Sequence, residues 1–140
     1  MKVFLGGTCH GTDWRDYLIS RLTCNYFNPV VDDWNEEAIQ REFKEREECD
    51  YLLYWITPKI QGVASIAEVI DDCHRRKGCV VFGYGYTPDG VFEAKMLRSL
   101  SHVGRLVRNS GNFAFDTLDA VAAYLNSNET HTLPEHPRSH

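Results

Sequence analysis

The apolar run Tyr51–Ile56 is the feature that most constrains the fold of this chain. A strand without polar alternation is typical of a central parallel strand that is buried on both faces. The run ends at Thr57-Pro58, and the stretch 61–72 that follows has the pattern of a helix. In open α/β sheets, ligands bind at the carboxyl ends of the strands. The sequence therefore places the carboxyl group of Glu68, about one turn inside that helix, where a site is expected.

The rest of the chain alternates between strand-like and helix-like segments in the same way. Alternation with short links predicts a parallel sheet with helices on both faces. Five strands in a chain of this size predict an α/β fold, with a flavodoxin-like, doubly wound five-stranded parallel sheet of order 2-1-3-4-5. The expected strands are 2–5, 26–31, 51–56, 79–82 and 113–115, and the expected helices are 14–22, 36–48, 61–75, 92–107 and 118–125.

Composition and charge exclude several classes of protein. The chain has 140 residues, of which 43% are hydrophobic, so it is not disordered by composition. The polar composition after Asn126 predicts one domain over residues 1–126 and a flexible C-terminal tail over 127–140. A net charge of −5 argues against a partner such as nucleic acid or an anionic membrane. No run has the length of a membrane span, and residues 1–5 are too short for a signal peptide, so a cytoplasmic protein is expected.

The cysteines and histidines predict neither a disulfide framework nor a metal site. The number of cysteines is odd, and none are spaced as CxxC. The C-terminal histidines lack the spacing of metal ligands. Most thiols are therefore expected to be reduced and structural, with Cys9, in a candidate site loop, as the exception.

The predicted strand order brings three polar or glycine-rich segments to one cleft. Gly6-Gly7-Thr8 would face the loop 62–68, and Asp32-Asp33-Trp34 would line the side. Glycines let the backbone approach a ligand closely, carboxylates accept hydrogen bonds from the amines of a nucleobase, and an indole stacks on its ring. Each segment also has a structural interpretation. The glycines fit a strand-to-helix turn, and Asp33 or Asn35 fits a helix cap.

Glu68 has a structural interpretation of its own. Ser65 and Glu68 have the spacing of a capping box, in which both side chains satisfy backbone N–H groups at a helix start. Periodicity alone favours this interpretation over a catalytic carboxylate.

Four segments occur together in an order and spacing that covers about residues 1–125. They are Val3–Thr8, Asn28–Trp34, Asp50–Tyr54 and Gly62–Glu68. Together they resemble the nucleoside 2-deoxyribosyltransferase family, and most closely a compact bacterial branch of it. The resemblance implies a flavodoxin-like fold and exchange of the base on a 2′-deoxynucleoside. The nucleophilic glutamate of the family falls on Glu68, and its glycine-rich first loop falls on Gly6 and Gly7.

The resemblance also implies partners and a course of reaction. The partners are 2′-deoxynucleosides and free nucleobases, no metal or organic cofactor is implied, and members are homo-oligomers with sites completed by a neighbouring subunit. Breaking an N-glycosidic bond develops positive charge at the anomeric carbon, which Glu68 would stabilise or trap covalently, with retention after the second attack. Asp33 is the expected proton donor to the leaving base. The wall that excludes water is expected to be formed by Trp34, Tyr54, Tyr84 and Tyr86.

Two positions depart from the pattern of the family. A tyrosine that hydrogen-bonds the nucleophile in many members corresponds here to Phe4, and an aspartate six residues before the glutamate corresponds to Gly62. Contact with the base or sugar would then pass to Asp32 or Asp33, and a further acid aligns with Glu42. The expected substrate-binding residues are Gly6, Gly7, Thr8, Asp32, Trp34, Glu42, Tyr54, Gly62 and Ser65.

Two other functions remain open on the sequence alone. A 2′-deoxynucleoside 5′-monophosphate N-glycosidase, which is a hydrolase, would need a phosphate pocket, and Gly6-Gly7-Thr8 with Ser65 at a helix N-terminus could form one. These loops carry no clear arginine or lysine, so hydrolysis ranks second. The third function is a non-catalytic nucleotide-binding domain, which the fold alone would permit.

Overall fold

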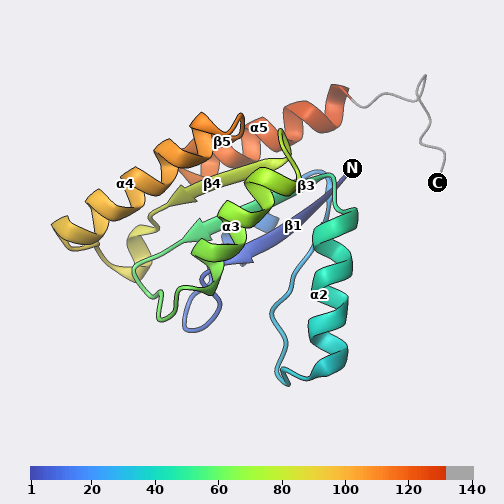
Figure 1. Ribbon diagram of the computed structural model, residues 1–140, viewed down its shortest axis with the longest axis horizontal. Helices are drawn as coiled ribbons and strands as arrows, with labels where there is room; N and C mark the ends of the chain where they lie inside the picture. Colours follow the sequence, from blue (N-terminus) through green and yellow to red (C-terminus); the bar gives the residue numbers. More distant parts are fainter. Residues whose placement is uncertain (132–140) are drawn as a thin grey trace.

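The computed structural model describes residues 1–131 and confirms the predicted α/β fold (Figure 1). All five strands pair in parallel, in the order β2-β1-β3-β4-β5. The strands are β1 (Lys2–Gly7), β2 (Asn25–Phe27), β3 (Tyr51–Ile56), β4 (Val80–Tyr84) and β5 (Phe113–Phe115). The helices are α1 (Trp14–Ile19), α2 (Glu36–Glu48), α3 (Ala64–Arg75), α4 (Ala94–Asn109) and α5 (Leu118–His131), with a 3-10 turn η1 (Thr87–Asp89).

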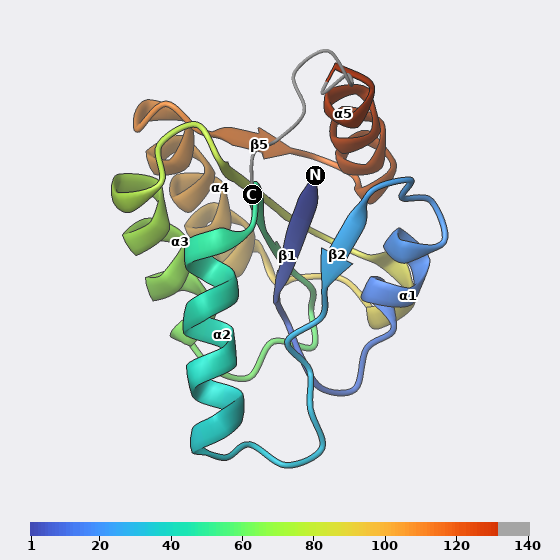
Figure 2. The same ribbon diagram turned by 90° about the vertical axis from the view of Figure 1, so that its right-hand side faces the viewer.

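The helices form a layer on each face of the sheet, with α2, α3 and α4 on one side and α1 and α5 on the other (Figure 2). The central strand β3 supplies both cores, because its side chains alternate between the two layers. Leu53 and Trp55 pack on the side of α1 and α5, whereas Leu52, Tyr54 and Ile56 pack on the side of α3 and α4. This two-sided burial explains the unbroken apolar run in the sequence. None of the helices in the described part of the chain has the length and apolar character that crossing a bilayer requires.

Two element ends differ from the sequence prediction. Strand β2 ends at Phe27 instead of residue 31, because Pro29 has no N–H and the Asn28 side chain accepts a hydrogen bond from Val30 N (3.0 Å) in a local turn. Helix α5 continues past the predicted end at residue 125 to His131. The tail expected over 127–140 therefore begins inside a helix, and its remaining part, 132–140, lies outside the described residues.

The pairing of β1 with β3 brings the loops after these two strands together. Gly7 lies opposite Trp55, and Thr8 N donates a hydrogen bond to Trp55 O at 3.0 Å. The hydroxyl of Thr8 in turn accepts from Thr57 N at 2.9 Å. Gly7 has a φ of +117°, and a Cβ at this position would overlap the backbone of Trp55. Glycine is therefore required at position 7 so that the first loop can turn against β3.

Replacing Gly7 by alanine should destabilise the fold strongly, because the added methyl group meets backbone atoms in a conformation that favours glycine. We expect Gly7→Ala to lower the free energy of unfolding by at least about 2 kcal/mol. Gly62→Ala is the matched control, because a Cβ there meets no atom within 4 Å. Urea denaturation of both variants gives the comparison, and equal stability of the two would contradict the structural requirement at Gly7.

Candidate active site

A cavity of about 430 Å³ lies at the carboxyl ends of β1 and β3, on the side covered by α2 and α3. Its volume falls within the range of small-molecule sites, which is about 300–1,000 Å³. The lining comes from the end of β1 and the loop after it, from the loop between β2 and α2, from α2 itself, and from the first turns of α3. The lining residues are Phe4, Gly6, Gly7, Cys9, His10, Pro29, Val30, Val31, Asp32, Trp34, Glu42, Ala64, Ser65 and Glu68.

Helix α3 positions Glu68 on the wall of this cavity. The helix begins at Ala64 with Val63 as its N-cap residue, and no side chain caps it. Ser65 therefore lies inside the first turn and not at the cap, so the capping box expected from the sequence does not form. The side chain of Glu68 is 28% exposed and faces α2. The capping-box interpretation of this glutamate is thus wrong, and its carboxyl group lines the cavity.

The carboxyl group of Glu68 faces two charged side chains of α2, the acid Glu42 and the cation Arg46. It shares a hydrogen bond with the carboxyl group of Glu42, and its Oε2 lies 3.6 Å from Arg46 Nη1. Burial is the largest cause that raises the pKa of Glu68, followed by the hydrogen bond and the negative charge of Glu42, while Arg46 acts in the opposite direction. The result is a pKa raised from 4.5 to about 7. Near neutral pH this group can therefore exist as a carboxylate or as an acid.

Arg46 is fixed by a buried ion pair with α3. It is 5% exposed, and its Nε and Nη2 donate to the two oxygens of Asp72 at 3.1 Å and 2.9 Å. The hydroxyl of Tyr54 donates to the same carboxylate at 2.5 Å. The sequence suggests only a solvated (i, i+4) pair between Glu42 and Arg46, as on an isolated helix. Glu68 and Asp72 on α3 have the same (i, i+4) spacing as Glu42 and Arg46 on α2. This matching spacing was the sequence signal that the two helices meet through charged residues.

The loop between β2 and α2 contributes Asp32 and Trp34 to the cavity, but not Asp33. Trp34 is 56% exposed at the mouth of the cavity. The carboxylate of Asp33 points elsewhere, where it accepts from Asn35 Nδ2 at 3.3 Å. Asn35 is the N-cap of α2 and accepts from Ala38 N at 2.9 Å, so the predicted cap is confirmed at Asn35. Of the two adjacent acids, the structure thus brings only Asp32 to the cavity lining.

Tyr54 lies behind the cavity and does not line it. Its ring is fully buried and packs on Gly6, where a Cβ would come within 2.7 Å of Tyr54 Cε1 and 2.9 Å of Phe4 Cε2. Tyr84 is also absent from the lining of this cavity. Tyr86 lines a separate cavity beside α1 and α5, and its hydroxyl donates to Asp13 Oδ1 at 2.5 Å. Of the four expected aromatic wall residues, only Trp34 therefore reaches this cavity.

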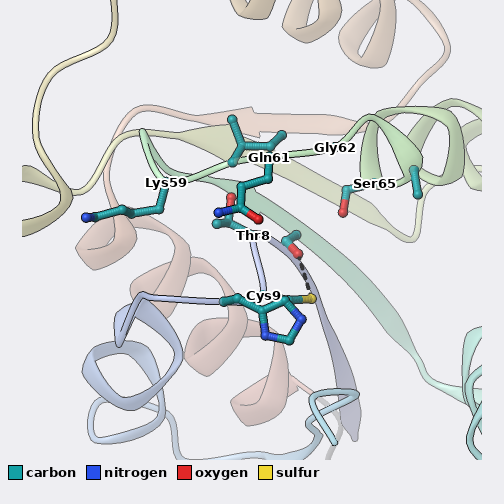
Figure 3. Close-up of a pocket in the computed structure, with 10 residues that line it drawn as sticks. Thr8, Cys9, Lys59, Gln61, Gly62 and Ser65 are labelled. Atoms are coloured by element: carbon teal, nitrogen blue, oxygen red, sulfur yellow. Dashed lines mark hydrogen bonds between the residues drawn. The ribbon is translucent and has the colours of Figure 1, made fainter. Parts of the chain in front are cut away.

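A smaller cavity of about 140 Å³ adjoins the large one at the N-terminus of α3 (Figure 3). It contains four of the predicted residues, Gly7, Thr8, Gly62 and Ser65, and the lining residues common to both cavities are Gly7, Cys9, His10, Ala64 and Ser65. The polar atoms of Thr8 are already used within the fold, since its carbonyl oxygen accepts from Trp14 Nε1 and Arg15 Nη1. Cys9, which the sequence places in a candidate site loop, lines this cavity together with His10, whereas sequence reasoning missed the lining residues Lys59 and Gln61.

The polar groups around these cavities are carboxylates, hydroxyls and backbone amides, together with the thiol of Cys9, the imidazole of His10, and the side chains of Lys59 and Gln61. Within residues 1–131, no group of three or more histidine, cysteine, aspartate or glutamate side chains is placed to hold a metal ion. All five cysteines are free, and Cys9 Sγ is directed to Gly7 O at 3.3 Å (Figure 3).

Comparison with known proteins gives one match. A family model described as "Nucleoside 2-deoxyribosyltransferase like" matches residues 1–86. The matched region runs from β1 to the end of β4 and includes Glu42, Arg46 and Glu68. No curated protein and no solved structure gives a significant match.

The raised pKa of Glu68 predicts how stability depends on pH. Between pH 4.5 and about 7 the folded state holds a proton on Glu68 that the unfolded state has lost, so this group makes the free energy of unfolding fall as pH rises. Glu68→Gln stays neutral at every pH. On going from pH 4 to pH 8, its free energy of unfolding should therefore rise by about 1–3 kcal/mol relative to that of the native chain.

Urea denaturation of both proteins at these two pH values checks this expectation. The exposed Glu37→Gln on α2 is the control for the loss of one acid. The same stability difference between Glu68→Gln and the native chain at both pH values would contradict it.

Proposed function

Because the chain belongs to the nucleoside 2-deoxyribosyltransferase-like family, we propose that it exchanges the base of 2′-deoxynucleosides, with Glu68 as the nucleophile. The observation that carries this proposal is the position of Glu68. Its partly exposed carboxyl group lines a cavity of about 430 Å³ at the carboxyl ends of the two central strands. This is the edge at which ligands of open α/β sheets bind.

The proposed reaction has two displacements at the anomeric carbon. One oxygen of the Glu68 carboxylate attacks C1′, the C1′–N bond breaks, and the departing base keeps the electron pair of that bond and takes up a proton. A second base then attacks C1′ through its nitrogen and loses its proton, and the bond to the Glu68 oxygen breaks. Two inversions give net retention, through a covalent deoxyribosyl-glutamate intermediate.

We assign proton transfer to the leaving base to Asp32, in the loop between β2 and α2, because the neighbouring Asp33 carboxylate is directed to Asn35. Asp32 lines the cavity, and Asp33 follows it in the same loop. Trp34 lies beside Asp32 and offers a ring face on which a base can stack. Proton transfer of this kind contributes roughly 10²–10⁴-fold to the rate.

Transfer instead of hydrolysis requires that water be kept from the intermediate. Part of the required wall is apolar, because Phe4, Pro29, Val30 and Val31 line the cavity. The mouth is open, since Trp34 is 56% exposed and Val31 is 41% exposed. We therefore propose that the chain acts as a homo-oligomer in which a neighbouring subunit covers this mouth.

The proposal predicts that the protein makes deoxyadenosine from deoxyinosine and adenine. Glu68→Gln should lower the rate by at least about 10³-fold while the protein remains folded, because the amide cannot form the glycosyl intermediate. Chromatography of the products measures transfer, and circular dichroism checks the fold. The exposed Glu48→Gln on α2 should keep the native rate.

Trapping with a 2-fluoro-2-deoxynucleoside locates the nucleophile directly. Peptide mapping by mass spectrometry should find the label on Glu68, and a label on another residue would contradict the assignment. Free hypoxanthine without new nucleoside would indicate hydrolysis. No reaction with several donors would favour a non-catalytic nucleotide-binding domain.

One observation favours hydrolysis of 2′-deoxynucleoside 5′-monophosphates as the second candidate. The small cavity beside the large one combines the Ser65 hydroxyl, the N-terminus of α3 and the imidazole of His10. Lys59 lies at its rim, so a cation is present near the loops for which the sequence suggested none. These are groups that bind phosphate, and a nucleoside in the large cavity could reach them with its 5′ substituent.

If this second candidate is correct, Lys59→Ala should raise KM for a deoxynucleoside monophosphate about tenfold, because it removes one charge-assisted contact. The KM for the unphosphorylated nucleoside should not change. Steady-state kinetics with both substrates measures the difference, and Lys44→Ala, which removes an exposed lysine of α2, is the control. An equal effect on both substrates would exclude a phosphate contact at Lys59.

A further inference from the structure

Helices α2 and α3 face each other through two pairs of charged residues, each pair one helical turn apart. Helix α2 contributes Glu42 and Arg46, and α3 contributes Glu68 and Asp72. The guanidinium of Arg46 reaches both residues of α3, because its Nη1 lies 3.6 Å from Glu68 Oε2 and its Nη2 lies 2.9 Å from Asp72 Oδ1. Arg46 therefore connects the candidate nucleophile to a buried carboxylate that lies deeper in the fold.

Asp72 and Tyr54 together fix the plane of this guanidinium. Asp72 is fully buried and accepts two parallel hydrogen bonds from Arg46, at 3.1 Å and 2.9 Å. Tyr54, also fully buried, donates a third hydrogen bond to Asp72 Oδ2 at 2.5 Å. A bidentate pair of this kind sets orientation as well as distance. With Nε and Nη2 bound to Asp72, the Nη1 edge is the part of Arg46 directed at Glu68.

Stability alone gives little reason for such an arrangement. A buried ion pair contributes about as much as well-packed apolar side chains of the same volume. The pair is therefore better explained by what Arg46 does for its third partner. The ring of Phe4, which lines the same cavity, has no hydrogen-bond donor to offer to Glu68.

We propose that Arg46 is a positioning residue for Glu68, and that Asp72 and Tyr54 hold it so that its charge offsets that of Glu42 at the nucleophile. This inference rests on the proposed function, in which Glu68 attacks the anomeric carbon. Arg46 itself does not line the cavity, so it is assigned a role through Glu68 and not through contact with the base or sugar.

The charged groups around Glu68 show why a fixed cation matters there. Burial, Glu42 and Asp72 all raise the pKa of Glu68, and Arg46 is the neighbour that lowers it. Without Arg46, Glu68 would hold its proton at neutral pH and would be a poor nucleophile. The titratable and charged groups that face Glu68 are Glu42 and Arg46 on α2, Asp72 on α3, Asp32 in the loop before α2, and Cys9 and His10 across the cavity.

The test removes Arg46 without leaving a buried carboxylate unpaired. Arg46→Met alone would leave the buried carboxylate of Asp72 with only Arg75 Nη1, at 3.2 Å, and the Tyr54 hydroxyl as partners, so the double variant Arg46→Met/Asp72→Leu replaces both members of the main pair by apolar groups. The titration of Glu68 is followed by NMR on protein labelled with ¹³C at glutamate carboxyls, and the resonance is assigned by its absence in Glu68→Gln. We expect the midpoint in the double variant to rise by about one pH unit, because the loss of Arg46 outweighs the loss of Asp72, whose charge acts on Glu68 in the opposite direction. Arg46→Lys keeps a positive charge but lacks the planar guanidinium with its two-pronged hydrogen bonding, so it should shift the Glu68 midpoint less.

Arg76 provides a matched control for a purely structural effect. It also holds α3 against the end of α2, because it donates to the carbonyl oxygens of Arg46 at 2.6 Å and Cys49 at 2.7 Å. Arg76 is not among the neighbours that shift the pKa of Glu68. Arg76→Met should lower the melting temperature and leave the Glu68 midpoint unchanged. A midpoint shift in Arg76→Met as large as that in the double variant would overturn the proposal.

Labelling by the 2-fluoro-2-deoxynucleoside separates this inference from the proposed function. If Glu68 of the native chain is labelled, its labelling rate at pH 7 should fall about fivefold in the double variant and recover at higher pH, as a one-unit shift requires. Normal labelling at Glu68 with an unchanged midpoint in the double variant would overturn the role of Arg46 and leave the function intact. Absence of label from native Glu68 would overturn the proposed function, and with it the positioning role.

Discussion

The candidate site depends on the parallel pairing of β1 with β3. Gly7 lies against the backbone of Trp55, and Thr8 is then hydrogen-bonded to Trp55 and Thr57, so the first loop and the segment leading to α3 leave the sheet side by side. Any side chain at position 7 would separate them. Because α3 starts from this fixed edge, the pairing of strands determines where the backbone of Glu68 lies, one turn inside the helix.

The second wall of the site is held by charge, which is unusual for a pair of packed helices. Helix α2 extends beyond the edge of the sheet, as Figure 1 shows. Arg46 and Cys49 are its buried residues near the C-terminal end, whereas Phe43 is 54% exposed. The ion pair of Arg46 with Asp72 therefore holds the part of α2 that carries Glu42, and with it the loop of Asp32. One buried interaction thus influences both the geometry and the electrostatics of the cavity.

The sequence predicted the features that local patterns determine. It did not predict the features that depend on how two distant segments pack against each other. The apolar run of β3 and the alternation of elements were enough for the strand order and for the position of Glu68. The run could not tell which of its rings faces the cavity, and Tyr54 points instead to α3. Asp32 and Asp33 are adjacent residues of the same type, so the sequence cannot distinguish them. After the turn around Pro29, only Asp32 lines the cavity. Arg46 looked solvated because the sequence of its own helix does not show that this face meets α3, and the matching spacing of Glu68 and Asp72 was the signal for it.

A carboxylate that must trap a sugar without losing it to water faces two opposing requirements. Burial excludes water from the intermediate, but it also favours the protonated form, which cannot attack. In this chain burial and Glu42 raise the pKa of Glu68 to about 7, and Arg46 limits the rise. A fixed cation below the carboxylate satisfies both requirements, because it favours the charged form without admitting solvent. Under the proposed function, the balance between transfer and hydrolysis should then be decided at the open mouth beside Trp34, and not at Glu68 itself.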